Sequence, residues 1–123
     1  MSGDYLPLFD PGDQIPMVTG APVTAGQVLY VSADNTVSAT ATAVVPIGIA
    51  GQDDPVGGAT IMVKRRGVWV LAASGAIAAG ALVIPAAAGA VATIASDTNY
   101  GHVVGSALAA AANNKVTVAL RLA

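Results

Sequence analysis

Apolar and polar residues alternate along short stretches of this chain, and small or turn-forming residues separate one stretch from the next. In residues 115–122, KVTVALRL, most alternate positions carry a large apolar side chain. Alternation with a period of two is typical of a β-strand with one buried face. Apolar and β-branched runs of this kind predict nine strands, at residues 27–31, 37–41, 44–51, 60–64, 67–72, 81–84, 90–94, 102–108 and 115–122.

Glycine, proline, aspartate and asparagine mark the connections between these strands. Asp53–Gly58 (DDPVGG) is a turn-rich loop, and Arg65–Gly67 is predicted to be a hairpin turn between Met62 and Trp69. The Ala-rich stretch 107–112 has a high helix propensity, but it is too short to hold a helix unaided. We therefore predict an all-β fold.

A pattern of residues repeats once along the chain, at an offset of 54 positions. The stretch 23–31 (VTAGQVLYV) resembles 77–84 (IAAGALVI), and both lead through a turn into another apolar run. Further along, 45–51 resembles 101–107. A period of this length with several short strands is typical of a barrel or sandwich made of similar sheets. The pattern predicts a small β-barrel or sandwich of two similar halves, at about 23–71 and 77–123.

Residues 1–22 differ from the rest and are predicted to form an extended N-terminal arm, with the β-domain covering 23–123. Four of the seven prolines lie in this arm, and proline disfavours helices and central strands. An extended segment with apolar anchors usually lies in a groove, on its own domain or on a partner. The apolar anchors of the arm are Tyr5, Leu6, Leu8, Phe9 and Ile15.

The composition indicates a thin core that is completed by contacts with other subunits. Hydrophobic residues make up 54% of the chain, but many are alanine, and aromatic residues make up only 4%. The uncharged stretch 67–96 follows a basic run, as in a transmembrane helix with positive flanks. Pro85 and several glycines interrupt it, and its similarity to 23–31 argues against a membrane span.

Acidic and basic residues are divided between the two ends of the chain. Residues 1–63 contain six aspartates and no basic residue, whereas residues 64–123 contain five basic residues and one aspartate. Such a division orients neighbouring copies or matches a charged partner. Two faces of one domain that differ in charge would give the same pattern.

Residue types that carry out catalysis are scarce. The chain has no cysteine and no glutamate, and its single histidine, His102, falls within a predicted strand. Asp53 and Asp54 form at most a weak Ca²⁺ site, and a solvated turn is the simpler interpretation. The run Lys64–Arg66 beside Trp69 is too small for a nucleic-acid site in an acidic chain. We predict that the protein is not an enzyme and uses no metal or other cofactor.

The order of the motifs resembles a known family. An opening YLP…PG leads into the stretch 23–28 (VTAGQV), then PIGIA, RGVW, AASGAIAAG and VVGSA, and finally a closing VTV strand. This series resembles the small capsid decoration, or cement, proteins of tailed phages, especially those of actinobacterial hosts. The similarity covers nearly the whole chain. No single motif is specific, so the order and spacing of the motifs support the resemblance.

The resemblance implies a virion structural protein on the outer surface of the phage capsid. It implies binding to the expanded shell, stabilised contacts between major capsid subunits, and homotrimers at three-fold and quasi-three-fold positions, with neither nucleic acid nor membrane as partner. A tail, fibre or cell-surface β-module without catalytic activity is the alternative, and a carbohydrate-binding module is disfavoured because Trp69, Tyr30 and Tyr100 are scattered. The inferred contact residues are Tyr5, Leu6, Leu8, Phe9, Ile15, Lys64, Arg65 and Arg66.

Overall fold

The computed structural model describes residues 14–39, 44–95, 97–121 of the chain. Within these residues it contains ten β-strands and two short 3₁₀ helices, which confirms the predicted all-β fold. The elements are β1 (Gln14–Thr19), β2 (Val28–Ala33), β3 (Thr36–Ala39), β4 (Pro46–Ala50), β5 (Thr60–Lys64), β6 (Val68–Ala72), β7 (Leu82–Pro85), η1 (Ala87–Gly89), β8 (Val91–Thr93), η2 (Tyr100–His102), β9 (Gly105–Ala107) and β10 (Lys115–Leu120).

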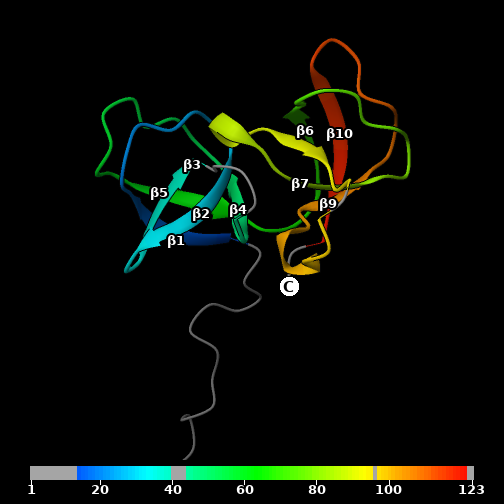
Figure 1. Cartoon of the computed structure of the whole chain (residues 1–123). Helices are drawn as coiled ribbons and strands as arrows, with labels where there is room; N and C mark the ends of the chain where they lie inside the picture. Colours follow the sequence, from blue (N-terminus) through cyan, green and yellow to red (C-terminus); the bar gives the residue numbers. More distant parts are fainter. Residues whose placement is uncertain (1–13, 40–43, 96, 122–123) are drawn as a thin grey trace, which may run out of the picture.

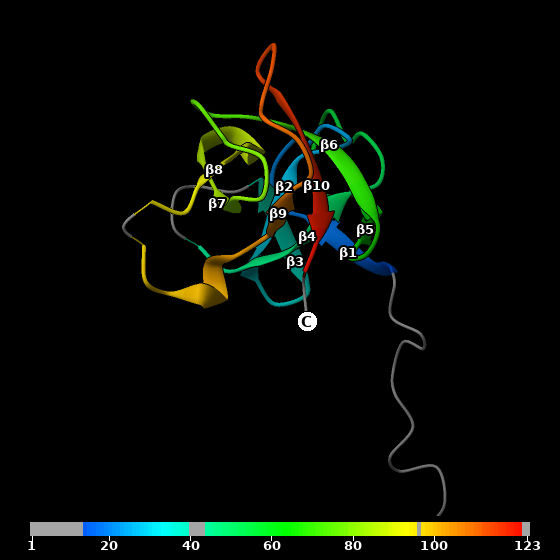
Figure 2. The same cartoon turned by 90° about the vertical axis from the view of Figure 1, so that its right-hand side faces the viewer.

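The strands form two units of five that lie side by side (Figure 1). The first unit is a closed barrel with the strand order β1-β3-β2-β4-β5, in which β5 pairs back onto β1. The second unit is a sheet with the order β6-β10-β9-β7-β8. Figure 2 shows β10 and β6 of this second sheet facing the viewer.

The strands of the two units pair with one another in the same order. In the first unit β1 pairs antiparallel with β5 and parallel with β3. In the second unit β6 pairs antiparallel with β10, and Ala73, just after β6, forms a parallel bridge with Val91 of β8. The units thus correspond strand by strand from β1 and β6 onward. The sequence duplication at about 23–71 and 77–123 stays a prediction, and this correspondence begins one strand earlier than those bounds.

Strand β1 lies in the stretch 1–22 that was predicted to form an extended N-terminal arm. It pairs with β5 along Gln14–Val18, and Val18 and Thr19 pair with β3. Pro16 lies opposite Met62 of β5. Pro16 lies outside the two residues of β1 that pair with β3. Its backbone nitrogen therefore needs no hydrogen bond on that side of the strand, and the missing N–H is tolerated. The remainder of the arm, residues 1–13, lies outside the described residues.

Two apolar clusters fill the molecule, and one of them joins the units. The first barrel encloses a cluster that includes Leu29, Val37 and Val63. The larger cluster combines Val28 and Ile49 of the first barrel with residues of the second sheet such as Leu71 and Val83. Full burial of a Val or Ile side chain contributes about 1.5–3 kcal/mol. The units are therefore held together by shared core and not only by the chain between them.

Two further predictions differ from the structure. Arg65–Gly67 is no hairpin turn, because β5 and β6 belong to different units and do not pair. His102 lies in η2 and not in a strand, because strand β9 begins only at Gly105. The predicted strands otherwise overlap observed ones with small differences at their ends. Within the described part of the chain no helix is long and apolar enough to cross a membrane.

Candidate functional site

The basic run Lys64–Arg66 lies at the junction between the two units. Lys64 ends β5, opposite Gln14, and its amino group donates a hydrogen bond to the Gln14 side chain. Arg65 donates from Nε to the carbonyl oxygen of Ile47 at 3.1 Å. The carbonyl oxygen of Arg66 accepts from the indole nitrogen of Trp69 at 3.0 Å. The run therefore fixes the start of the link between the units against the first barrel, and the exposed Arg66 places positive charge on the surface.

The predicted contact residue Ile15 belongs to the first barrel. Its side chain is half-buried and lies on the same face of β1 as Met17, which packs against the barrel core. Successive residues of a strand point to opposite faces. Ile15 is thus placed as a barrel residue rather than a free anchor, and its role in contacts stays a prediction. The other predicted anchors, Tyr5, Leu6, Leu8 and Phe9, lie outside the described residues.

Asp54 is a buried structural carboxylate and not part of a solvated turn. Its side chain is only 5% exposed, and it accepts a hydrogen bond from the Thr19 hydroxyl at 2.5 Å. The backbone N–H groups of Val56, Gly57 and Ala59 also donate to it. The Thr19 hydroxyl, followed by the Gly57 N–H, lowers the pKa of Asp54 from 3.8 to about 2.

These hydrogen bonds occupy both carboxylate oxygens of Asp54 with donors from its own loop and from β1. Asp53 accepts from the backbone N–H of Ala25 at 2.7 Å. Among the described residues no group of three or more acidic or histidine side chains could hold a metal ion. The predicted alternative of a weak Ca²⁺ site therefore gains no support from the geometry of Asp53 and Asp54.

His102 forms a small polar cluster with two neighbours in the segment around η2. Its Nδ1 lies 2.7 Å from a carboxylate oxygen of Asp97, and its Nε2 lies 3.3 Å from the side-chain nitrogen of Asn99. The hydrogen bond with His102, followed by the Asn99 N–H, lowers the pKa of Asp97. Asn99 also accepts from the backbone of Gly101. All these bonds are local, so the cluster stabilises a turn.

Exposed valines distinguish β6 from an ordinary strand of the barrel. Val68 and Val70 are 58% and 60% exposed, whereas Leu71 is buried and Trp69 is half-buried against the core. The alternation of VWVLA is weak because both faces of the strand are apolar. Sequence reasoning therefore predicted this strand without identifying Val68 and Val70 as surface residues. Their exposure leaves apolar area for a partner to cover.

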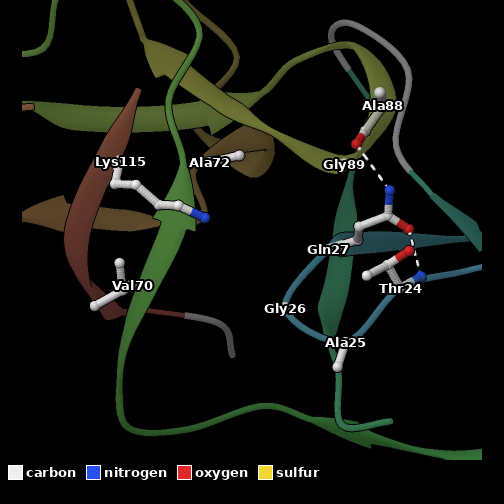
Figure 3. Close-up of a pocket in the computed structure, with 9 residues that line it drawn as sticks. All are labelled: Thr24, Ala25, Gly26, Gln27, Val70, Ala72, Ala88, Gly89 and Lys115. Carbon is white, nitrogen blue, oxygen red and sulfur yellow. Dashed lines mark hydrogen bonds between the residues drawn. The ribbon is translucent and has the colours of Figure 1, made fainter. Parts of the chain in front are cut away.

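A groove of about 270 Å³ runs beside β6, between the two units. Its lining includes Val70 and Ala72 of β6, Lys115 of β10, and the loop residues Thr24–Gln27. In Figure 3 a gap separates the β6 ribbon from this loop, and Gln27 lies beside the turn at Ala88 and Gly89. The Gln27 amide donates to the Ala88 carbonyl oxygen at 3.1 Å and fixes that wall of the groove.

The groove is suited to binding an extended chain rather than to chemistry. It holds one charged side chain, Lys115, and the remaining lining residues are small, apolar or amide-bearing. A Cβ atom placed on Gly26 would have no neighbour within 4 Å, so the space beside this loop is open. Open space along a strand is the geometry in which a protein accepts a further strand.

Comparisons with known proteins identify a family and a solved structure with a similar fold. The family model "Phage cement protein" matches residues 44–122. A crystal structure of the N base of head fibre gp8.5 of bacteriophage phi29 has a similar fold, with a TM-score of 0.68 and 19% sequence identity, covering 88% of this chain and 92% of that one. No curated protein matches the chain.

The family model covers residues 44–122, more than half of the chain, and the solved structure has a similar fold. The match to the family model confirms the predicted resemblance to phage cement proteins, whereas the link to actinobacterial hosts stays a prediction. The protein is thus a structural component of a phage virion, and the chain belongs to the phage cement protein family.

Proposed function

We propose that this protein binds the outer surface of the expanded phage capsid and stabilises the contacts between major capsid subunits. The observation that carries the proposal is the exposed apolar surface of a small all-β body: Val68 and Val70 on β6 and Leu108 beyond β9 are all more than half exposed. Monomeric proteins usually keep such side chains scattered or covered. A capsid surface that buries them would gain hydrophobic free energy on binding.

The proposed contacts combine an apolar arm with a basic junction. Tyr5, Leu6, Leu8 and Phe9 are proposed to contact the capsid or a sister subunit, while the run Lys64–Arg66 faces an acidic surface. The described residues carry five basic and four acidic side chains, whereas residues 1–13 carry three aspartates and no basic residue. The two parts of the chain therefore suit surfaces of opposite charge.

The proposed mechanism is thermodynamic linkage. A protein that binds the expanded shell, but not its dissociated subunits, stabilises the shell by mass action. Many copies that each bridge neighbouring subunits add avidity. We propose that the copies act as homotrimers, without nucleic acid, membrane, metal or cofactor, and that no residue has a catalytic role.

Reconstitution tests this function. Purified full-length chain is added to expanded shells that lack it, beside a Leu8→Ser/Phe9→Ser variant and a control Val56→Ser variant in an exposed loop away from the proposed contacts. We expect saturable binding and a higher shell melting temperature with the full-length chain and with the control, and weaker binding with the arm variant. Equal binding by all three would place the contact on the β-body, and no binding by any would contradict the proposed function.

A fibre-base role is the second candidate, because the similar solved structure is the base of a phage head fibre. In the proposed fibre-base role this protein would anchor a further module, whereas in the proposed cement role it bridges capsid subunits. Crosslinking of reconstituted shells separates the two roles. A cement is expected to crosslink to two adjacent capsid subunits, and a fibre base to crosslink to additional protein that projects from the shell.

A further inference from the structure

Strand β6 leaves most of one edge of its backbone unpaired. It pairs with β10 over Val68–Ala72, and on its other side the pairing within the described residues is a parallel bridge of Ala73, just after the strand, with Val91 of β8. The N–H of Ala73 donates to the Asn114 carbonyl, and the N–H of Leu120 donates to the Gly67 carbonyl. In an antiparallel ladder alternate residues bond to the same neighbour. The backbone groups of Val68 and Val70 therefore point away from β10, and they lie outside the bridge to β8.

The corresponding edge of the first unit is blocked by proline. Strand β1 corresponds to β6, and Pro16 pairs with Met62 of β5 as Val70 pairs with Thr117 of β10. Proline on an edge removes an N–H donor and prevents another strand from adding there. At the equivalent position β6 has Val70, with its N–H intact. The second unit therefore keeps open an edge that the first unit closes.

The groove described above lies along this open edge. Val70 and Ala72 line one side of it, and Gly26, Gly89 and Gln27 line the other. A Cβ atom on Gly89 would meet the Gln27 Cβ at 2.6 Å, so the glycine lets the turn and the loop pack closely. The wall opposite β6 is thus held in place, and the groove of about 270 Å³ lies between this wall and the strand.

We propose that this groove binds the N-terminal segment, residues 1–13, of a second copy of the chain as an added β-strand. The stretch Tyr5–Phe9 has five residues, as many as β6. If Leu6 and Leu8 turn their backbone groups toward β6, Pro7 turns away, so its missing N–H costs no ladder bond. The aspartates of the segment, Asp4, Asp10 and Asp13, complement the positive charge of Lys115 and of the run Lys64–Arg66.

The place where the segment joins the barrel favours a second copy over the same chain. Gln14 lies at the Lys64 end of β1, whereas the groove is lined by loop 24–27, which follows the far end of β1. In Figure 1 the blue strand β1 lies on the lower side of its barrel and the blue loop that follows lies on the upper side. A chain returning to its own groove would have to reverse direction. Thirteen extended residues span up to about 45 Å, enough to reach a neighbour.

This inference deepens the proposed function by naming a sister subunit as the partner of the arm, and it is tested without shells so that the two can fail separately. The chain has no cysteine, which allows unambiguous disulfide trapping. Full-length chains carrying Leu8→Cys or Leu6→Cys are mixed with chains carrying Val70→Cys and oxidised. The matched control replaces Val70→Cys by Val56→Cys, at a loop position that is 82% exposed.

We expect at least ten-fold more mixed disulfide with Val70→Cys than with Val56→Cys, because paired strands hold opposite Cα atoms within disulfide range. A yield equal to that of the control for both arm positions would overturn the proposal. A doubly substituted chain that forms its disulfide only within itself would assign the groove to its own arm, and would also overturn it.

A proline substitution gives an independent measurement of the same edge. Val70→Pro reproduces in β6 the block that Pro16 makes in β1. In solution, by light scattering on a sizing column, the unaltered chain is expected to be an oligomer and Val70→Pro to be a monomer with an unchanged circular dichroism spectrum. An oligomer that persists in a folded Val70→Pro variant would contradict the proposal. If the variant does not fold, the disulfide experiment decides alone.

Discussion

At the scale of single residues, Asp54 holds the loop between β4 and β5 against β1. Its carboxylate receives the Thr19 hydroxyl and backbone N–H groups, and the Thr19 hydroxyl in turn accepts from the Gly58 N–H at 2.8 Å. The backbone of Asp54 also pairs with Val23 through two bonds of 2.9 Å. One side chain thus satisfies donors that would otherwise be buried without partners. In the second unit the Ala111 N–H bonds to Ile77 in the corresponding place, without such a carboxylate.

The first prediction concerns the charge of Asp54. Because the pKa of Asp54 falls from 3.8 to about 2 on folding, the ionised form stabilises the fold at every pH above about 4. This contribution is lost as the pH falls from about 4 to about 2. Asp54→Asn is expected to melt at a lower temperature than the unaltered chain at pH 7, and the difference is expected to shrink below pH 4.

Melting curves followed by circular dichroism from pH 7 to pH 2 measure this difference. Asp34→Asn is the matched control, because it removes the same charge from an exposed turn. A melting temperature of Asp54→Asn equal to that of Asp34→Asn at pH 7 would show that the carboxylate of Asp54 has no special role.

At the scale of strands, one glycine in each unit permits the same close contact. A Cβ atom on Gly48 of β4 would lie 2.6 Å from the carbonyl oxygen of Lys64, and one on Gly105 of β9 would lie 2.1 Å from that of Ala119. Lys64 and Ala119 occupy matching places in β5 and β10. Real Cβ atoms do not approach backbone so closely, so the fourth and fifth strands of each unit require glycine here.

The second prediction is that Gly48→Ala and Gly105→Ala each lower stability by about 1–3 kcal/mol, as overpacked substitutions do. Urea unfolding of the purified variants measures the change. Gly101→Ala is the control, because its Cβ would meet only the Asn99 side chain, at 3.0 Å. A stability of Gly48→Ala or Gly105→Ala equal to that of Gly101→Ala would show that the strands can separate without loss.

The positions of the strands could be predicted from the sequence better than the partners with which they pair. β5 was predicted with its observed ends, because its apolar alternation and the flanking turn residues are local signals. The connection Arg65–Gly67 was misassigned, since a short polar link looks the same whether it joins paired strands or two units. β1 was missed because its prolines mask a strand that tertiary pairing with β5 stabilises. The groove beside β6 arises from segments distant in sequence, so no local pattern could predict it.

At the scale of the whole molecule, the shared core decides whether the two units unfold together. Ile49 belongs to the first barrel but packs in the cluster formed mainly by the second sheet, whereas Ile61 packs only in the cluster of the first barrel. Both side chains are almost completely buried. Units that share core residues lose stability together, because separating them exposes Val28 and Ile49 to water.

The last prediction follows from this arrangement. The unaltered chain is expected to unfold in one calorimetric transition, with equal calorimetric and van't Hoff enthalpies. Ile61→Ala removes about 2–5 kcal/mol from the first barrel alone, yet it should lower the temperature of that one transition without splitting it. Ile49→Ala loses a similar amount and also opens the junction, so it alone is expected to broaden or divide the transition. Two separate transitions for Ile61→Ala would mean that the shared core does not couple the units, and the arm and groove would then act on independently folding halves.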